Sequence, residues 1–367
     1  MPEWIHWTLA EGFGMGLVKV FGHGPIGATS PSLAFIILAV ALSGFVQAIP
    51  AYLWAKTAKI NLSVDRRRGG YIIGFAVAAC LATICAFASF RLTSQAELAI
   101  NTFISSVPGI GILAVYGGFR KFPGEVRPGP RQWIAVVAGM VGLAYIMLPN
   151  IMSLFTIGIP PWFLWSLGTM AGSASTEILA KEIAYYERKN KLTKLDPRIL
   201  QVFGGTTMGI LAFATFLLTI LFDGSIIESE APFSTLVALV LIFPGVVWLG
   251  ATIWAGIGQF GWWTFRLKAF QANADITYKK FPGVGVYLLT AMLGGTLIYG
   301  NPLSVEKFIL VFILFPTITF CAHSGSEKLL IKVFATLPKN ILLQTGVLKD
   351  KTISPVSIEP TISSKAS

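Results

Sequence analysis

The sequence has very little charge for its length. Only 12% of its 367 residues are charged, whereas a soluble globular chain carries roughly 25%. Apolar residues make up 54% of the chain, and the mean hydropathy is +0.71. A soluble core could not enclose that much apolar surface, but a lipid bilayer could. The composition therefore predicts an integral membrane protein.

The chain is also poor in the residues that enzymes use for chemistry. It has three histidines far apart in the sequence and three cysteines inside apolar segments, where we expect them to serve as small packing residues. No HExxH, GxSxG or Walker-type glycine loop is present. We therefore expect no enzyme activity, no catalytic residues, no metal and no cofactor. The six residues are His6, His23, His323, Cys80, Cys85 and Cys321.

The apolar residues fall into runs of about 20, the length of helix that crosses roughly 30 Å of hydrocarbon. Backbone polar groups inside a bilayer must be satisfied within the segment, so such runs are helices, and the alternation typical of a membrane barrel is absent. The sequence predicts an all-α membrane protein with ten spans. They lie near 4–22, 33–55, 70–90, 97–118, 132–150, 159–181, 200–222, 234–263, 279–300 and 304–322.

The basic residues test this count of spans. The net charge of +11 would suggest a nucleic-acid partner in a soluble protein, but cytoplasmic loops of membrane proteins also collect positive charge. If Lys181 at the rim of the sixth span is included, all basic residues except Lys19, Arg91 and Lys307 fall on one side. That side comprises the tail and the loops 56–69, 119–131, 182–199 and 264–280. We therefore predict a multi-pass protein with both termini in the cytoplasm and no nucleic-acid partner.

The tail, residues 323–367, divides into two parts. Residues 325–337 have the pattern of a short amphipathic helix on the membrane surface, and the residues from about 349 have the composition of a disordered segment. We place the protein in a plasma membrane or bacterial inner membrane in preference to an endomembrane. The expected partners are a small-molecule substrate and membrane lipids, and a homodimer is left open.

Two passages recur across the halves of the chain. Residues 90–92 and 107–112 read FRL and VPGIGI, and residues 265–267 and 281–286 read FRL and FPGVGV, at offsets of 175 and 174 residues. A weaker echo links WTLA at 7–10 with WSLG at 165–168. Five spans is an odd number, so the second copy, 151–322, is inverted relative to the first, 1–150. Inverted repeats are typical of secondary transporters.

With these features the chain resembles the drug/metabolite transporter superfamily, in particular its ten-span EamA-type members. The resemblance covers nearly all of residues 1–322 and includes a Pro-Gly helix, a short loop and a Gly-containing last span in each half, at 108–145 and 282–320. The Gly-Glu pair that the family has between its last two spans survives only as Gly124-Glu125. Gly300-Asn301 takes its place in the second half. The resemblance implies that spans one, three, four, six, eight and nine surround the substrate path.

Charged residues inside spans are the first candidates for a site. A charge near a helix centre costs about 2.5–3.5 kcal/mol on insertion scales, so it is usually paired or faces a wet cavity. Glu11 and Lys19 lie in the first span, and Glu177 and Lys181 lie four residues apart in the sixth, a spacing suited to a local ion pair. The repeat aligns Lys19 with Glu177, and we predict that they pair across a central cavity. The alternative is that Lys19, Lys181 and Glu11 snorkel to the interface.

Spans four and nine supply further candidates for substrate binding. Asn101 and Ser105 lie on one stripe of span four, and Lys280 and Tyr287 lie on one face of span nine. The alternatives are helix–helix hydrogen bonding for the first pair and ordinary loop charge for Lys279 and Lys280. A Lys280 that points inward would favour an anionic substrate. Prolines free a backbone carbonyl and loosen a helix, so we assign hinges to Pro108-Gly109 and Pro282-Gly283.

Span eight adds one aromatic candidate. Trp254 lies deep enough to stack on a flat substrate, whereas Trp262 and Trp263 fit an interfacial belt. The glycine pairs 12/16 and 168/172 have the spacing of faces at which helices pack closely. The overlong eighth span contains Pro244-Gly245, where we expect a kink or a short interfacial lead-in.

These observations predict a secondary transporter that moves a small organic metabolite by alternating access. No nucleotide-binding motif is present, so ATP is not the direct driver. One alternative is a nucleotide-sugar or phosphorylated-metabolite antiporter of an endomembrane. A second is a membrane scaffold or lipid-handling protein without a transport cycle. A cavity lined by Glu11, Asn101, Glu177 and Tyr287 would favour a carrier, and a wholly apolar interior would favour a scaffold.

Overall fold

The computed structural model describes most of the first 299 residues. These residues are mainly helical, and no strand occurs among them, which confirms the all-helical prediction for this part of the chain. The predicted spans at 132–150 and 304–322 and the predicted tail lie outside it, apart from Val137 and Val141. The described ranges are 3–30, 32–93, 101, 104–106, 108–122, 137, 141, 158–222 and 245–299.

The first helical stretch changes its hydrogen-bond register near its middle. It runs as α1 (Glu3–Val18), a π-helical segment η1 (Lys19–His23) and α2 (Gly24–Thr29). The N–H of Gly24 bonds to the carbonyl of Lys19, five residues back. Pro25 follows at once, and its ring would crowd the carbonyl four residues earlier in a regular α-helix. The π segment therefore lies where Pro25 disfavours α-helical bonding, and π segments are frequent at functional sites.

The remaining helices begin and end at local signals. Asp65 caps α4, Pro161 starts α8 and Pro197 starts α9, positions at which these residue types favour a helix start. Lys121 ends α6 in the left-handed conformation, with φ of 45°. The bounds are α3 Leu33–Thr57, α4 Arg66–Leu92, α6 Gly109–Arg120, α8 Pro161–Lys189, α9 Pro197–Phe222, α12 Gly245–Gln271 and α13 Lys280–Tyr299.

Three of the described helices are long and apolar enough to cross a membrane: Leu33–Thr57, Arg66–Leu92 and Pro197–Leu221. Other helices carry charged groups along their length. α8, for example, contains Glu177, Lys181 and Glu182 within six residues. The length and composition of the three apolar helices agree with a membrane protein.

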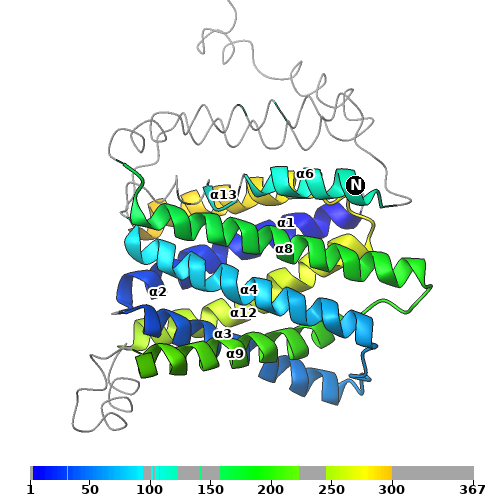
Figure 1. Ribbon diagram of the computed structural model, residues 1–367, viewed down its shortest axis with the longest axis horizontal. Helices are drawn as coiled ribbons and strands as arrows, with labels where there is room; N and C mark the ends of the chain where they lie inside the picture. Colours follow the sequence, from blue (N-terminus) through cyan, green and yellow to red (C-terminus); the bar gives the residue numbers. More distant parts are fainter. Residues whose placement is uncertain are drawn as a thin grey trace, which may run out of the picture. The chain divides into compact units, whose positions relative to one another are not determined.

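Glycines allow the helices to pack closely. α3 packs along α9, α4 along α8, and α1 along both α12 and α13 (Figure 1). A Cβ atom added at Gly12 would lie 2.3 Å from the carbonyl oxygen of Gly283, and one at Gly172 would lie 2.7 Å from the Cβ of Ala82. The glycine pairs 12/16 and 168/172 are therefore packing faces, as the sequence predicted.

One sequence prediction about span eight is wrong, and another lies outside the described residues. The predicted loop 264–280 is wrong because α12 continues to Gln271, so that Arg266 lies inside a helix and is fully buried. The described part of this span begins at Gly245, whose φ of +76° is a left-handed conformation that glycine adopts without strain. Pro244 lies outside the described residues, and with it the predicted kink.

We predict that Asp65→Ala lowers the free energy of unfolding by ~1 kcal/mol through loss of a helix cap. The Asp65 carboxylate accepts hydrogen bonds from the backbone N–H groups of Arg67 (3.1 Å) and Arg68 (3.0 Å) at the start of α4. Burial alone would raise the pKa of Asp65, but the hydrogen bonds and charge of Arg68 outweigh it and lower the pKa below 3.8. The contribution is therefore present above about pH 4 and is lost as pH falls through the lowered pKa. Thermal unfolding of both proteins at pH 7 and pH 3 checks this, and equal differences at the two pH values would contradict it.

Candidate functional site

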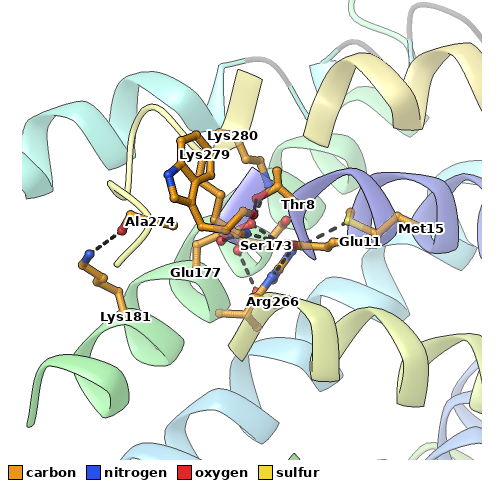
Figure 2. A network of polar contacts seen from close by, with 12 residues as sticks. Thr8, Glu11, Met15, Ser173, Glu177, Lys181, Arg266, Ala274, Lys279 and Lys280 are labelled. Atoms are coloured by element: carbon orange, nitrogen blue, oxygen red, sulfur yellow. Dashed lines mark hydrogen bonds and ion pairs between the residues drawn. The ribbon is translucent and has the colours of Figure 1, made fainter. Parts of the chain in front are cut away.

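Five charged side chains that are far apart in the sequence, except for the adjacent Lys279 and Lys280, meet inside the helix packing (Figure 2). We call them the charge cluster: Glu11 of α1, Glu177 of α8, Arg266 of α12, Lys279 of the turn before α13, and Lys280 at the start of α13. Arg266 Nε lies 2.7 Å from Glu11 Oε1, and Arg266 Nη2 lies 3.0 Å from Glu177 Oε1. Lys279 Nζ lies 2.5 Å from Glu11 Oε2 and 2.9 Å from Glu177 Oε2. Lys280 Nζ lies 3.2 Å from Glu177 Oε1.

Neutral groups hold the Arg266 guanidinium in place. It donates a hydrogen bond to the hydroxyl of Thr176, and its Nη2 lies 3.8 Å from the sulfur of Met15. The centre of the guanidinium also lies 4.5 Å from the ring centroid of Trp262, a cation–π contact. Arg266 is therefore held by a hydroxyl and an aromatic ring as well as by the two carboxylates.

A capped turn brings the two lysines to the cluster. Asn273 adopts a left-handed conformation with φ of 68°, directly after α12. The Asp275 carboxylate then accepts hydrogen bonds from the backbone N–H groups of Thr277 (2.9 Å) and Tyr278 (2.7 Å). Asparagine and aspartate are suited to these two roles, the left-handed position and the side-chain-capped turn. The turn 272–279 thus returns the chain toward Glu11 and Glu177.

The cluster carries more positive than negative charge. It contains three basic and two acidic groups, and all five side chains are buried. Removing ions from water costs several kcal/mol each, which is recovered only where good ion-pair geometry and further hydrogen bonds are present. Such an arrangement is therefore weak evidence for a role in stability alone. Ionisable residues inside a membrane are by default candidates for a functional site.

A cavity of about 80 Å³ adjoins the cluster. Four members of the cluster line it, Arg266 being the exception, together with Lys19 and Tyr287. A buried water needs roughly 10–15 Å³ of such space, so the cavity has room for several waters or a small solute. Its other lining residues are mainly small or apolar. They include Met15, Val18, Ala79, Ala82, Ala86, Ser105, Ser106, Thr169, Ser173, Gln259, Trp262 and Val284.

The predicted pairing of Lys19 with Glu177 is wrong. Lys19 Nζ lies 4.5 Å from the ring centroid of Phe90 and 5.4 Å from that of Tyr287. Glu177 is occupied by the three cations of the charge cluster. The two residues line the same cavity but do not form an ion pair, because Arg266, Lys279 and Lys280 surround the carboxylate of Glu177.

Lys181 also differs from its predicted role. Its Nζ donates a hydrogen bond of 2.5 Å to the carbonyl of Ala274, in the turn after α12. The ion pairs of Glu177, one turn earlier on α8, go to the charge cluster, so the predicted local pair with Lys181 is replaced. Snorkelling does not describe Lys181 or Glu11 either, because both side chains are buried.

Two further candidates lie away from the cavity. Asn101 is buried and donates hydrogen bonds to the hydroxyls of Ser89 (2.8 Å) and Thr93 (2.5 Å), the helix–helix bonding that was its alternative reading. Trp254 is 38% exposed, and its indole N–H donates to the carbonyl of Leu17 at 3.3 Å. Neither residue lines the cavity, whereas Ser105 and Tyr287 do.

The two Pro-Gly pairs that were predicted to be hinges both lie at the start of a helix. Pro108 precedes the first residue of α6, and Gly109 packs against Met170 of α8. Pro282 lies in the first turn of α13, and Gly283 packs against Gly12 and Thr8 of α1. Both Pro-Gly pairs thus lie at the start of a helix that contacts α1 or α8.

Sequence reasoning missed Arg266 and the role of Lys279. Arg266 was counted as a cytoplasmic loop charge, although its place in the repeated FRL triplet was a sign that it could lie inside a helix. Lys279 had only its position before Phe-Pro-Gly to mark it. His23, Gln259 and Trp262 also line the cavity and carried no functional signal in the sequence.

Comparisons with known proteins address the fold alone. No family model and no curated protein matches the chain. A solved structure titled only "Crystal structure of protein" is similar, with a TM-score of 0.52 and 15% sequence identity. The match covers 88% of this chain and 97% of that one. The fold and the site together define an all-helical protein with membrane-length apolar helices and a buried, charge-lined cavity.

Proposed function

We propose that this protein is a secondary transporter that moves a small organic solute across a membrane by alternating access. The observation that carries the proposal is the charge cluster beside a cavity, with all five ionised groups buried among helices. Ion pairs of this kind are costly to bury and are usually no better for stability than apolar packing. A cavity that admits a polar solute explains why buried ion pairs are present.

The helix contacts support two inverted five-helix halves. Under the repeat, α1, α3, α4 and α6 correspond to α8, α9, α12 and α13. If each helix is replaced by its counterpart, the α1–α12 contact becomes α8–α4 and the α1–α13 contact becomes α8–α6. The α3–α9 contact is unchanged. All five of these contacts are present. At residue level, Gly12 meets Gly283, and their counterparts at offsets of 158 and 174 residues, Met170 and Gly109, also meet.

We infer the full topology from this pattern and from the loop charges. Ten spans with both termini in the cytoplasm place the turn 272–279 and the charge cluster toward the cytoplasmic side of the cavity. Membership of the drug/metabolite transporter superfamily, with an EamA-type layout, is part of the same proposal. In the transport cycle the cluster closes the cytoplasmic end of the cavity, and its ion pairs separate when that end opens.

One specific observation favours the second candidate, a carrier of phosphorylated metabolites or nucleotide-sugars. Three lysines, Lys19, Lys279 and Lys280, line the cavity, and the positive charge that they bring favours an anionic solute. The scaffold alternative fits less well, since a scaffold has no use for charged groups around an internal cavity.

The test is a binding screen followed by exchange. Purified full-length protein is heated with amines, amino acids, organic acids, sugar phosphates and nucleotide-sugars, and the midpoint temperature of unfolding (Tm) is recorded. Solutes that raise Tm are then loaded into proteoliposomes, where we expect an outward gradient of unlabelled solute to drive uptake of the labelled one. Binding without any exchange would refute transport.

A further inference from the structure

Lys19 differs from every other lysine at the cavity. Its side chain is 6% exposed, and it begins the π-helical segment η1. Its contacts are with the faces of two aromatic rings, Phe90 and Tyr287. Within the described ranges, no carboxylate lies within ion-pair distance of its Nζ atom. Lys19 is therefore a buried cation that no opposite charge within those ranges neutralises.

The ring contacts compensate this cation only in part. A cation–π contact is much weaker than the cost of taking an ammonium group out of water. Buried charges in proteins are therefore normally paired with an opposite charge. Lys19 lines a cavity, so the missing opposite charge has a place to bind.

The charge cluster is less available to a ligand. Lys279 already lies beside Glu11 and Glu177, and Lys280 lies beside Glu177. An anion that binds these lysines must displace a carboxylate held at 2.5–3.2 Å. An anion that binds Lys19 displaces no charged partner.

The surroundings of Lys19 indicate the kind of anion. The side chains of Ser105 and Ser106 line the same cavity and supply hydroxyl groups, which donate hydrogen bonds to carboxylate or phosphate oxygens. Ala79, Ala82 and Ala86, spaced along one face of α4, give the wall an apolar stretch. The cavity therefore suits a small solute with one anionic group and an uncharged body.

We propose that Lys19 is the group that binds the carboxylate or phosphate of the transported solute, and that the charge cluster acts as a closure with no direct part in anion binding. This assignment rests on the proposed transport function. It names the substrate class, a small organic anion, and the residue that selects it. Lys19→Met should remove anion binding, whereas Lys19→Arg should retain much of it.

The first test compares probes that share a three-carbon body. Propionate, propyl phosphate, propionamide and propylamine are added to purified full-length protein at matched ionic strength, and Tm is measured. We expect at least one of the two anions to raise the Tm of the wild type and of the control Lys189→Met, which removes an exposed charge at the end of α8. Neither anion should shift Lys19→Met. A response to only one anion identifies the group as carboxylate or phosphate.

The assignment would be overturned by an equal response to propionamide, by no response to either anion, or by an unchanged response in Lys19→Met. The ligand-free proteins supply a second readout. Removal of an uncompensated buried charge should raise the Tm of Lys19→Met by about 2–4 °C. If Lys19 served only to pack against Phe90 and Tyr287, its replacement would lower Tm instead.

Exchange in proteoliposomes separates this proposal from the transport function. Labelled propyl phosphate does not cross lipid unaided, so its exchange reports on the protein. Binding that depends on Lys19 without exchange would refute transport and leave the anion site standing. Exchange that proceeds equally well in Lys19→Met would leave transport standing and overturn the role of Lys19.

Discussion

Glu177→Gln should abolish solute exchange and lower the Tm of the purified protein. Glu177 lies 3.0 Å from Arg266, 2.9 Å from Lys279 and 3.2 Å from Lys280. Glutamine has nearly the same volume but no charge, so three buried cations would be left with Glu11 as their only partner in the charge cluster. Removing one member of a buried ion pair typically costs about 3–5 kcal/mol. Thermal unfolding and solute exchange measure the two effects.

Two further variants make this prediction specific. Glu182→Gln changes the same residue type five positions along α8, where Glu182 pairs with the partly exposed Arg120 at 2.8 Å, and should cost far less. The double variant Glu177→Gln/Lys280→Gln removes one charge of each sign, so it should recover part of the lost stability. Wild-type Tm and exchange in Glu177→Gln would contradict the cluster as described.

Gly12→Ala should be strongly destabilising and should also stop exchange. A Cβ atom at position 12 would lie 2.3 Å from the carbonyl oxygen of Gly283, a backbone atom that cannot rotate away. α1 and α13 must then separate, which moves Glu11 away from Lys279. Overpacking of this kind costs typically about 1–3 kcal/mol or more. Tm and exchange are again the measurements.

Gly14→Ala is the matched control in the same helix. Its Cβ atom would lie 3.7 Å from the Cβ of Trp262, an ordinary van der Waals distance. Alanine also has a better helix propensity than glycine, so Gly14→Ala should be neutral or slightly stabilising. Equal effects of the two substitutions would show that α1 does not pack on α13 as described.

Much of the helical architecture could be predicted from the sequence. The apolar runs at 33–55, 70–90 and 200–222 correspond to α3, α4 and α9, because uninterrupted apolar length is a local property of the chain. The close packing at Gly12 and Gly172 could likewise be predicted from residue spacing. The bounds of α12 could not be predicted, since a charged residue such as Arg266 looks like a loop residue until its partners are known.

The partners in the site could not be predicted. Arg266 and Glu11 are 255 residues apart, and Lys279 and Glu177 are 102 residues apart. The repeat alignment correctly suggested that the residues of α1 and α8 face a common space, but it carried no information about which cation would reach Glu177. Arg266, Lys279 and Lys280 all pair with that carboxylate, and the turn 272–279 places the two lysines beside it. Lys19 is left to the aromatic rings.

In the proposed transporter, Lys19 and the charge cluster have different functions. The cluster contains one more basic group than acidic groups, and its ion pairs hold α1, α8, α12 and α13 together. Lys19, in the π-helical segment, is buried at the cavity without an acidic neighbour among the residues described. An anion at Lys19 would lower the net positive charge of the cavity, which gives substrate binding a direct electrostatic effect on the cluster.

Access to the cavity from both sides of the membrane is the most direct test of alternating access. Thr83 lines the cavity and is buried in α4, so Thr83→Cys, made after replacement of the native cysteines by alanine, reports on solvent entry. Ala41→Cys in the fully buried core of α3 is the control. We predict that a membrane-impermeant thiol reagent labels Thr83→Cys in proteoliposomes from outside and, when trapped, from inside, but labels Ala41→Cys from neither side. Labelling of Thr83→Cys from one side only would contradict an alternating-access transporter.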